Sequence, residues 1–201
     1  MSDNLPPDIS GPDLEALEAE LPALTRLRDF TTQAARQSWF AELGDPLTPT
    51  TRETAQQFLD MLGFPDASLT PVANWADTAA AAQSLDWDPT GWEAEEQLRA
   101  SVAAQALTVL SEEALTLGLA DLSARLQPIL QQALEEAAAL YDEEDTELIN
   151  AALGAALQAA HGAALATVCE TGPDHPLLLK YQLFCTGHWP IGIAGLSFNL
   201  F

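Results

Sequence analysis

Residues 148–169 read LINAALGAALQAAHGAALATVC, a run of 22 residues without a charged side chain in a chain of net charge −23. A helix without charge on any side is normally buried, either in a protein core or in a membrane. Asn150, Gln158 and His161 interrupt the run, and its flanks lack the Lys/Arg bias and the aromatic belts of membrane helices. The stretch therefore predicts a buried helix near 145–170 at the centre of a bundle, and not a membrane span.

This central helix has two unlike sides when it is drawn at about 3.6 residues per turn. One side carries the larger side chains, Ile149, Leu153, Leu157, His161, Leu165 and Val168. The other side carries the small residues Ala151, Ala155, Ala159, Gly162, Ala163 and Ala166. We expect the larger side chains to interlock with one neighbouring helix, and the smooth side to let a second helix approach closely.

The chain as a whole predicts an all-α fold, a compact multi-helix bundle of about seven to nine helices. Residues 1–11 are polar and contain Pro6 and Pro7, which predicts a flexible acidic tail. A chain of this length and apolar content buries one sizeable core, so residues 12–201 are expected to form a single helical domain.

Several short signals predict where the helices begin and end. Thr48–Pro49, Thr70–Pro71 and Ser111 are typical helix starts, and Gly63 is a typical helix end. Pro128 predicts a bent helix or two helices that meet there. The expected helices cover residues 22–43, 49–62, 72–85, 93–110, 122–141, 145–170 and 176–186, with a shorter one near Pro12. Another helix is expected to start at Ser111 and to break at Gly118 or Asp121.

The final segment, WPIGIAGLSFNLF at 189–201, differs from the helical pattern that precedes it. Two short apolar runs flank Ala194–Gly195, and the second alternates, which predicts a small β-hairpin. An isolated two-stranded hairpin is marginal in water. We therefore expect it to lie on the helical body or to pair with another chain in a hairpin-mediated dimer.

The charge balance restricts the partners of this protein, because seven basic residues face thirty acidic ones. Such a surface is repelled by phosphate backbones and anionic lipids, so no nucleic acid and no membrane is expected as a partner. A basic protein is the natural charged partner. Two cysteines make no disulfide framework, and the stretch MSDNLPPDIS lacks an export signal, which together predict a cytoplasmic protein.

The sequence contains no Gly-rich phosphate loop, no Gly-x-Ser-x-Gly elbow and no His-Glu-x-x-His, which favours a protein that is not an enzyme. His161 is the first candidate for a cofactor site, since a buried histidine is able to ligate a metal or haem. No Glu-x-x-His pair accompanies it, because position 158 is Gln. The alternative is a core histidine with one hydrogen-bond partner.

A second candidate is a zinc site formed by Cys169, His175, Cys185 and His188. Two thiolates and two imidazoles suit tetrahedral zinc, and the pair Cys185 and His188 has ligand-like spacing. The pair Cys169 and His175 is less typical, because structural zinc sites usually have two tightly spaced pairs. The alternative is that both cysteines pack as small apolar residues.

Partner-binding candidates are three tryptophans among acidic residues and one acidic turn. They are Trp75, Trp87, Trp92, Asp142, Glu143 and Glu144. Aromatic anchors ringed by negative charge suit a protein-binding surface for a basic partner. The alternative is that the tryptophans cover the ends of the core and that the acids form a solvated turn.

Two functional hypotheses follow. The first is a non-enzymatic acidic interaction protein, such as an immunity or inhibitor protein that neutralises a basic toxin or nuclease. The second is a helical bundle that binds a metal, haem or an apolar small molecule near His161. No motif in the sequence requires a cofactor, and zinc or haem enters only through the second hypothesis.

Overall fold

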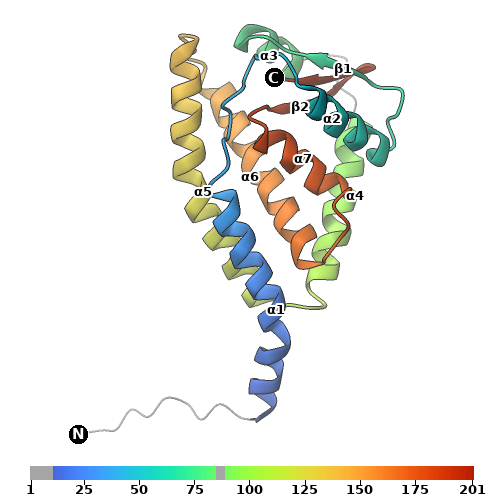
Figure 1. Cartoon of the computed structure of the whole chain (residues 1–201), viewed down its shortest axis with the longest axis vertical. Helices are drawn as coiled ribbons and strands as arrows, with labels where there is room; N and C mark the ends of the chain where they lie inside the picture. Colours follow the sequence, from blue (N-terminus) through green and yellow to red (C-terminus); the bar gives the residue numbers. More distant parts are fainter. Residues whose placement is uncertain (1–10, 85–88) are drawn as a thin grey trace, which may run out of the picture.

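The computed structural model describes residues 11–84 and 89–201, which form seven helices and a three-stranded sheet (Figure 1). The helical fold with a C-terminal hairpin is thus confirmed. The elements are α1 (Gly11–Ala34), α2 (Pro49–Leu62), β1 (Ser68–Pro71), α3 (Trp75–Ala82), α4 (Pro89–Ala106), α5 (Glu112–Leu140), α6 (Thr146–Val168), α7 (Pro176–Cys185), β2 (Pro190–Ala194) and β3 (Ser197–Leu200). The predicted tail lies outside the described residues, except for Gly11, which begins α1.

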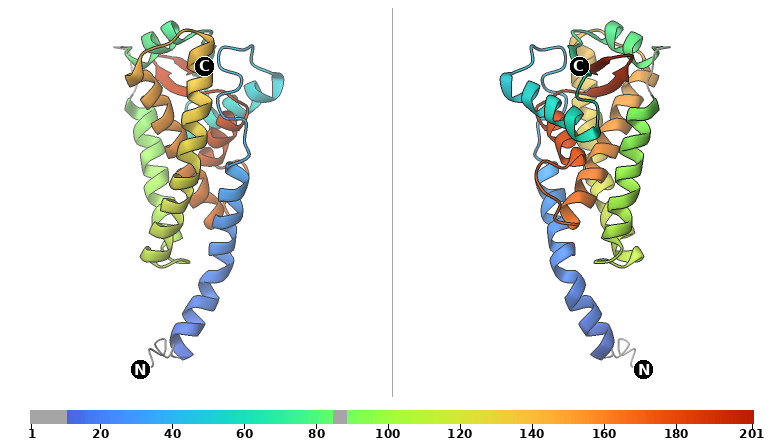
Figure 2. Two further views of the ribbon diagram at one scale, coloured as in Figure 1. Left: turned by 90° about the vertical axis from the view of Figure 1, so that its left-hand side faces the viewer. Right: turned by 90° about the vertical axis from the view of Figure 1, so that its right-hand side faces the viewer.

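Helix α6 is the centre of the bundle, as the uncharged stretch predicts. It packs against α1, α4, α5 and α7, and the views in Figure 2 show these helices around it. Helix α6 is long enough to cross a membrane, and its most apolar 18-residue stretch has a mean hydropathy of 1.3. However, 56% of that stretch is buried within the fold. Burial by four neighbouring helices is what the core helix of a bundle requires.

The small residues of α6, and not the large ones, are its most buried part. Ala152, Ala156, Ala160, Ala163 and Ala164 have no exposed surface. In contrast, Ile149, Leu153 and Leu157 are only partly buried, because the first half of α6 is covered mainly on one side. The expectation that large side chains interlock along one whole face is therefore wrong, and close approach of small residues dominates the packing.

Two helix starts were correctly indicated by the sequence. Thr48 Oγ1 accepts a hydrogen bond from Thr51 N (3.1 Å), and Ser111 Oγ accepts one from Ala114 N (3.3 Å). Each bond satisfies an otherwise unpaired amide in the first turn. Helix α5 is one continuous helix from Glu112 to Leu140, so the predicted break at Gly118 or Asp121 is wrong, and the helix also continues through Pro128.

Helix α1 ends nine residues before the expected boundary, at Ala34 instead of Leu43. Trp39, Phe40 and Leu43 are buried, but they lie in the loop that follows. Phe40 has φ of 57°, which no residue inside a right-handed helix adopts. Apolar residues at helix-like spacing therefore mark a buried loop here.

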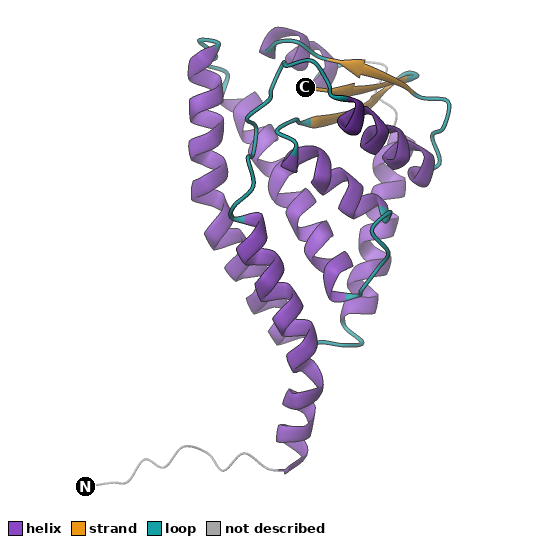
Figure 3. Ribbon diagram, in the orientation of Figure 1, coloured by secondary structure: helices purple, strands orange, loops and turns teal. Residues whose placement is uncertain are grey.

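The sheet has the strand order β1-β3-β2 and lies at one end of the molecule, beside α2 and α3 (Figure 3). The antiparallel pair of β2 and β3 confirms the hairpin. The strand β1 was not expected, since Thr70–Pro71 reads as a helix start; it pairs in parallel with β3, Ser68 opposite Ser197. The hairpin thus gains its third strand from its own chain, and pairing with another chain stays a prediction.

Candidate functional site

His161 forms a hydrogen bond with a side chain of the neighbouring helix. Its Nε2 lies 2.7 Å from Ser123 Oγ on α5. Burial lowers the pKa of His161, and the positive charge of Arg99 lowers it further. No group of three or more His, Cys, Asp or Glu that could hold a metal occurs in the described part of the chain. His161 therefore fits a neutral boundary histidine better than a metal ligand.

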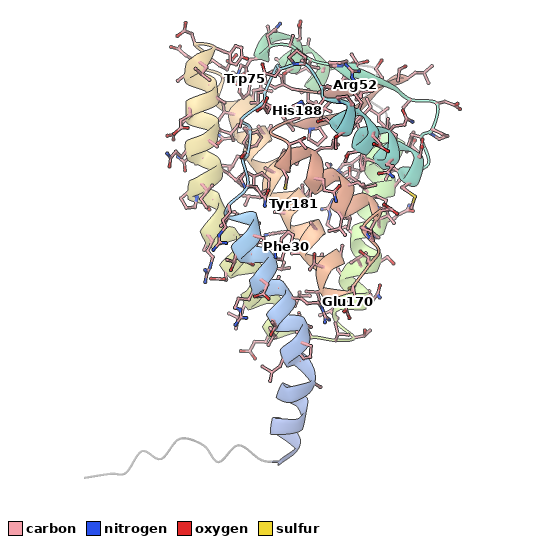
Figure 4. The ribbon with its side chains drawn as sticks, in the orientation of Figure 1. Phe30, Arg52, Trp75, Glu170, Tyr181 and His188 are labelled. Carbon is pink, nitrogen blue, oxygen red and sulfur yellow. The ribbon has the colours of Figure 1, made fainter. Side chains whose placement is uncertain are left out.

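The predicted zinc ligands are not brought together. His175 caps the start of α7, where its Nδ1 accepts from Leu177 N (3.3 Å), whereas Cys185 is the last residue of this helix. The ten residues of α7 place His175 and Cys185 about 15 Å apart along the helix axis. This separation is far too large for two ligands of one zinc ion. Figure 4 shows His188 far from Glu170, which follows Cys169 in the chain. The zinc prediction is wrong for this physical reason.

Both cysteines pack as small residues in largely apolar surroundings. Cys169 Sγ lies 3.4 Å from the backbone oxygen of Val102. Burial raises the pKa of the Cys185 thiol to about 11, and a side-chain hydrogen bond with Tyr181 lowers this pKa only in part. A thiol with a raised pKa carries little thiolate at neutral pH, which makes it a poor nucleophile and a poor metal ligand.

The three tryptophans do not form a common surface. Trp75 is 2% exposed, and its ring packs against Trp189 and Phe201 at centroid distances of 6.5 Å and 5.2 Å. The use of Trp75 as a surface anchor is therefore wrong. Trp87 lies outside the described residues. Trp92 is 53% exposed on α4 and is the one described tryptophan of the three that reaches solvent.

The acidic turn between α5 and α6 carries an apolar centre that the sequence analysis missed. Leu140 is 83% exposed, and Tyr141 beside it is half-exposed and donates a hydrogen bond from its hydroxyl to Leu43 O (3.0 Å). We call this surface the acidic tip; it consists of Glu135, Glu136, Leu140, Tyr141, Asp142, Glu143, Glu144, Asp145 and Glu147. None of these carboxylates is in an ion pair with a described residue.

The turn itself is held by its own side chains and backbone. Glu143 N donates to Ala138 O (3.0 Å), and Glu143 Oε1 accepts from Asp145 N (2.8 Å). Asp145 in turn caps α6 by accepting from Glu147 N and Leu148 N. Glu143 and Asp145 thus fix the backbone, while Asp142, Glu144 and Glu147 remain exposed to solvent. The exposed charges are presented on a defined frame.

A cavity of about 120 Å³ lies where α2, α4, α6, α7 and the hairpin meet. Its walls are mostly apolar, and Trp92 lines it together with Phe58, Ile193 and Phe198. Inside it, Lys180 Nζ donates to both carboxylate oxygens of Glu95, at 2.7 Å and 2.8 Å. The two side chains are 16% and 14% exposed. Lys180 is the single lysine of the chain, the one signal that could have drawn attention to this place.

Comparison with known proteins adds no family to these observations. The chain matches no protein-family model, no curated protein and no solved structure. The function therefore has to be inferred from the acidic tip, the cavity and the charge.

Proposed function

We propose that this protein is a non-enzymatic acidic interaction protein that binds a basic partner protein through the acidic tip. An immunity or inhibitor protein that neutralises a basic toxin or nuclease is the class that fits best. The observation that carries the proposal is the exposure of Leu140, 83%, in the middle of seven carboxylates.

An exposed leucine next to a half-exposed tyrosine resembles the centre of a protein interface. Interfaces concentrate their binding energy in a few residues, among which Tyr, Trp and Arg are enriched, and energetically neutral contacts around them exclude water. The acidic tip has the composition for this arrangement, because the exposed Leu140 and Tyr141 lie close in the chain to the exposed acids Glu136, Asp142 and Glu144. Tyr141 is held in place by its bond to Leu43 O, which reduces the entropy lost on binding.

The charge of the tip determines which partner suits it. Between Arg125 and Lys180 the chain has no lysine or arginine, and no carboxylate of the tip is in an ion pair with a described residue. A basic partner gains from long-range attraction during encounter, and this attraction is screened by salt. An acidic partner is repelled by the same field.

The test uses affinity capture from the native lysate with the full chain as bait, at low and at high salt. The bait variants are Leu140→Ser and, as a matched control, Leu196→Ser, which removes another strongly exposed leucine from the hairpin turn. We expect a basic protein that is lost at high salt, and whose recovery falls about ten-fold or more with Leu140→Ser but not with Leu196→Ser.

Three results would contradict the proposal. One is a partner without excess positive charge, and another is recovery that does not respond to salt. The third is equal recovery with Leu140→Ser and Leu196→Ser. If a basic partner is recovered as expected, the inhibitor class can be tested directly by measuring the nuclease or toxin activity of the purified partner with and without this protein.

A further inference from the structure

We propose that the cavity around Lys180 and Glu95 binds a small uncharged aromatic compound that carries one hydroxyl or primary amide group. The cavity shares no lining residue with the acidic tip, so this inference does not rest on the proposed function. It assigns a binding site to the place where α4, α7 and the hairpin meet.

The size of the cavity sets the size of the ligand. An engineered protein cavity of about 150 Å³ with apolar walls binds benzene. The cavity here, of about 120 Å³, is similar, and it is bounded by the rings of Phe58, Trp92 and Phe198 together with Leu62 and Ile193. Such walls favour a single aromatic ring, because offset and edge-to-face ring contacts add to the apolar burial. A haem or a nucleotide is far too large.

The ion pair explains why the ligand needs one polar group. Lys180 has three N–H donors, and Glu95 accepts two of them, which leaves one donor. The oxygens of Glu95 keep spare lone pairs for an incoming donor. A hydroxyl or primary amide both donates and accepts, so it is able to bond to both partners without breaking the pair.

The same pair argues against a charged ligand. Lys180 and Glu95 neutralise each other, so neither is left to balance the charge of a buried ion. An anion is also repelled by the net charge of −23. A cation would have to compete with Lys180 for Glu95. An uncharged polar group avoids both costs.

Phenol is the probe, with toluene and benzoate as comparison ligands of similar size. Binding to the purified full chain is measured by isothermal titration calorimetry and by fluorescence, since Trp92 lines the cavity. We expect saturable binding of one phenol per chain. Toluene, which lacks the polar group, and benzoate, which is charged, should each bind about ten-fold more weakly or not at all.

Two variants connect binding to the cavity. Ala155→Leu places a larger side chain in the cavity wall and should abolish phenol binding, whereas Ala120→Leu, at an exposed alanine of α5, should not. The double variant Lys180→Met/Glu95→Met removes the polar pair with little change in volume, and such replacements usually preserve the fold. It should lose the preference for phenol over toluene, a change that a merely structural role of the pair would not produce.

The inference is overturned if the unaltered chain shows no saturable phenol binding, or if Ala155→Leu binds phenol as well as the unaltered chain does. Benzoate binding at least as tightly as phenol would also overturn it. Circular dichroism confirms that each variant is folded, and if the double variant is not, the pair Ala155→Leu and Ala120→Leu still decides. Removal of the exposed leucine of the acidic tip in Leu140→Ser should leave phenol binding unchanged, so the two proposals fail separately.

Discussion

His188 is a buried histidine without a hydrogen-bond partner. It is 2% exposed, and neither ring nitrogen makes a hydrogen bond within the described structure. Figure 4 shows it at the same end of the molecule as Trp75, whose Nε1 is also buried without a partner. Burial lowers the pKa of His188, while the backbone of Thr186 and the charge of Asp45 oppose this effect less strongly.

The lowered pKa predicts a loss of stability in acid. Below its ordinary pKa of about 6.5 the histidine takes up a proton more readily in the unfolded chain than in the folded one. The contribution of His188 to the free energy of unfolding is therefore fully present above about pH 6.5, and it is lost as the pH falls through the folded-state pKa. Urea denaturation at several pH values should show that His188→Leu reduces this decrease.

His175→Asn is the control for this experiment. Asparagine preserves the capping of α7, and His175 is less buried than His188, although burial lowers its pKa as well. A decrease in stability with acid that is as steep in His188→Leu as in the unaltered chain would contradict the prediction.

At the scale of single elements, α6 offers two positions with opposite expected effects. Gly154 is an exposed residue inside the helix, and a Cβ there would meet no other atom within 4 Å. Gly154→Ala should raise the free energy of unfolding by about 0.5–1 kcal/mol, because alanine loses less backbone entropy on folding. Ala160→Leu should lower it by about 1–3 kcal/mol, because Ala160 is fully buried and the added atoms overfill the contact.

Chemical denaturation of both variants checks this pair. If Ala160→Leu leaves stability unchanged, then α6 is not packed as closely as its alanines indicate. If Gly154→Ala destabilises the protein, the exposed side of α6 is in contact with something other than solvent.

Some elements were predictable from the sequence because their signals are local. The caps Thr48 and Ser111, the end at Gly63 and the uncharged run of α6 all act within a few neighbouring residues. The strand β1 was missed because it exists only through pairing with β3, which lies far away along the chain.

The candidate sites were predicted less well, and for a related reason. Trp75 appeared exposed because acids surround it in sequence, but Trp189 and Phe201 cover it in the fold. Exposure of Leu140 depends on the turn between α5 and α6, and the cavity requires residues from six elements. Sequence spacing alone indicates neither, since both depend on tertiary packing.

At the scale of the whole molecule, the excess of negative charge has its own consequence. Five of the seven basic residues are already in ion pairs, so in the described chain the remaining carboxylates mostly repel one another. Repulsion between exposed charges destabilises the compact state and is screened by salt. The thermal unfolding midpoint should therefore rise by several degrees between about 20 mM and about 500 mM sodium chloride, where screening shortens to a few ångströms.

Removing charge from the acidic tip should weaken this response. A variant with Glu135, Glu136, Asp142 and Glu144 replaced by the corresponding amides has less repulsion to screen, and so a smaller rise in midpoint. A midpoint that is unchanged or lower in salt would show that charge repulsion does not limit the stability of this fold.

The parallel pairing of β1 with β3 imposes an order on folding during synthesis. Ser68 emerges 129 residues before its partner Ser197 (197 − 68). At about 5–20 residues per second, the ribosome needs roughly 6–26 s to deliver that partner. For this period β1 has no strand beside it, so the hairpin, which is synthesised after β1, completes the sheet. A nascent chain stalled before Ser197 should contain folded helices and an unpaired strand β1. Unpaired strand edges are prone to aggregation, and chaperones protect such states.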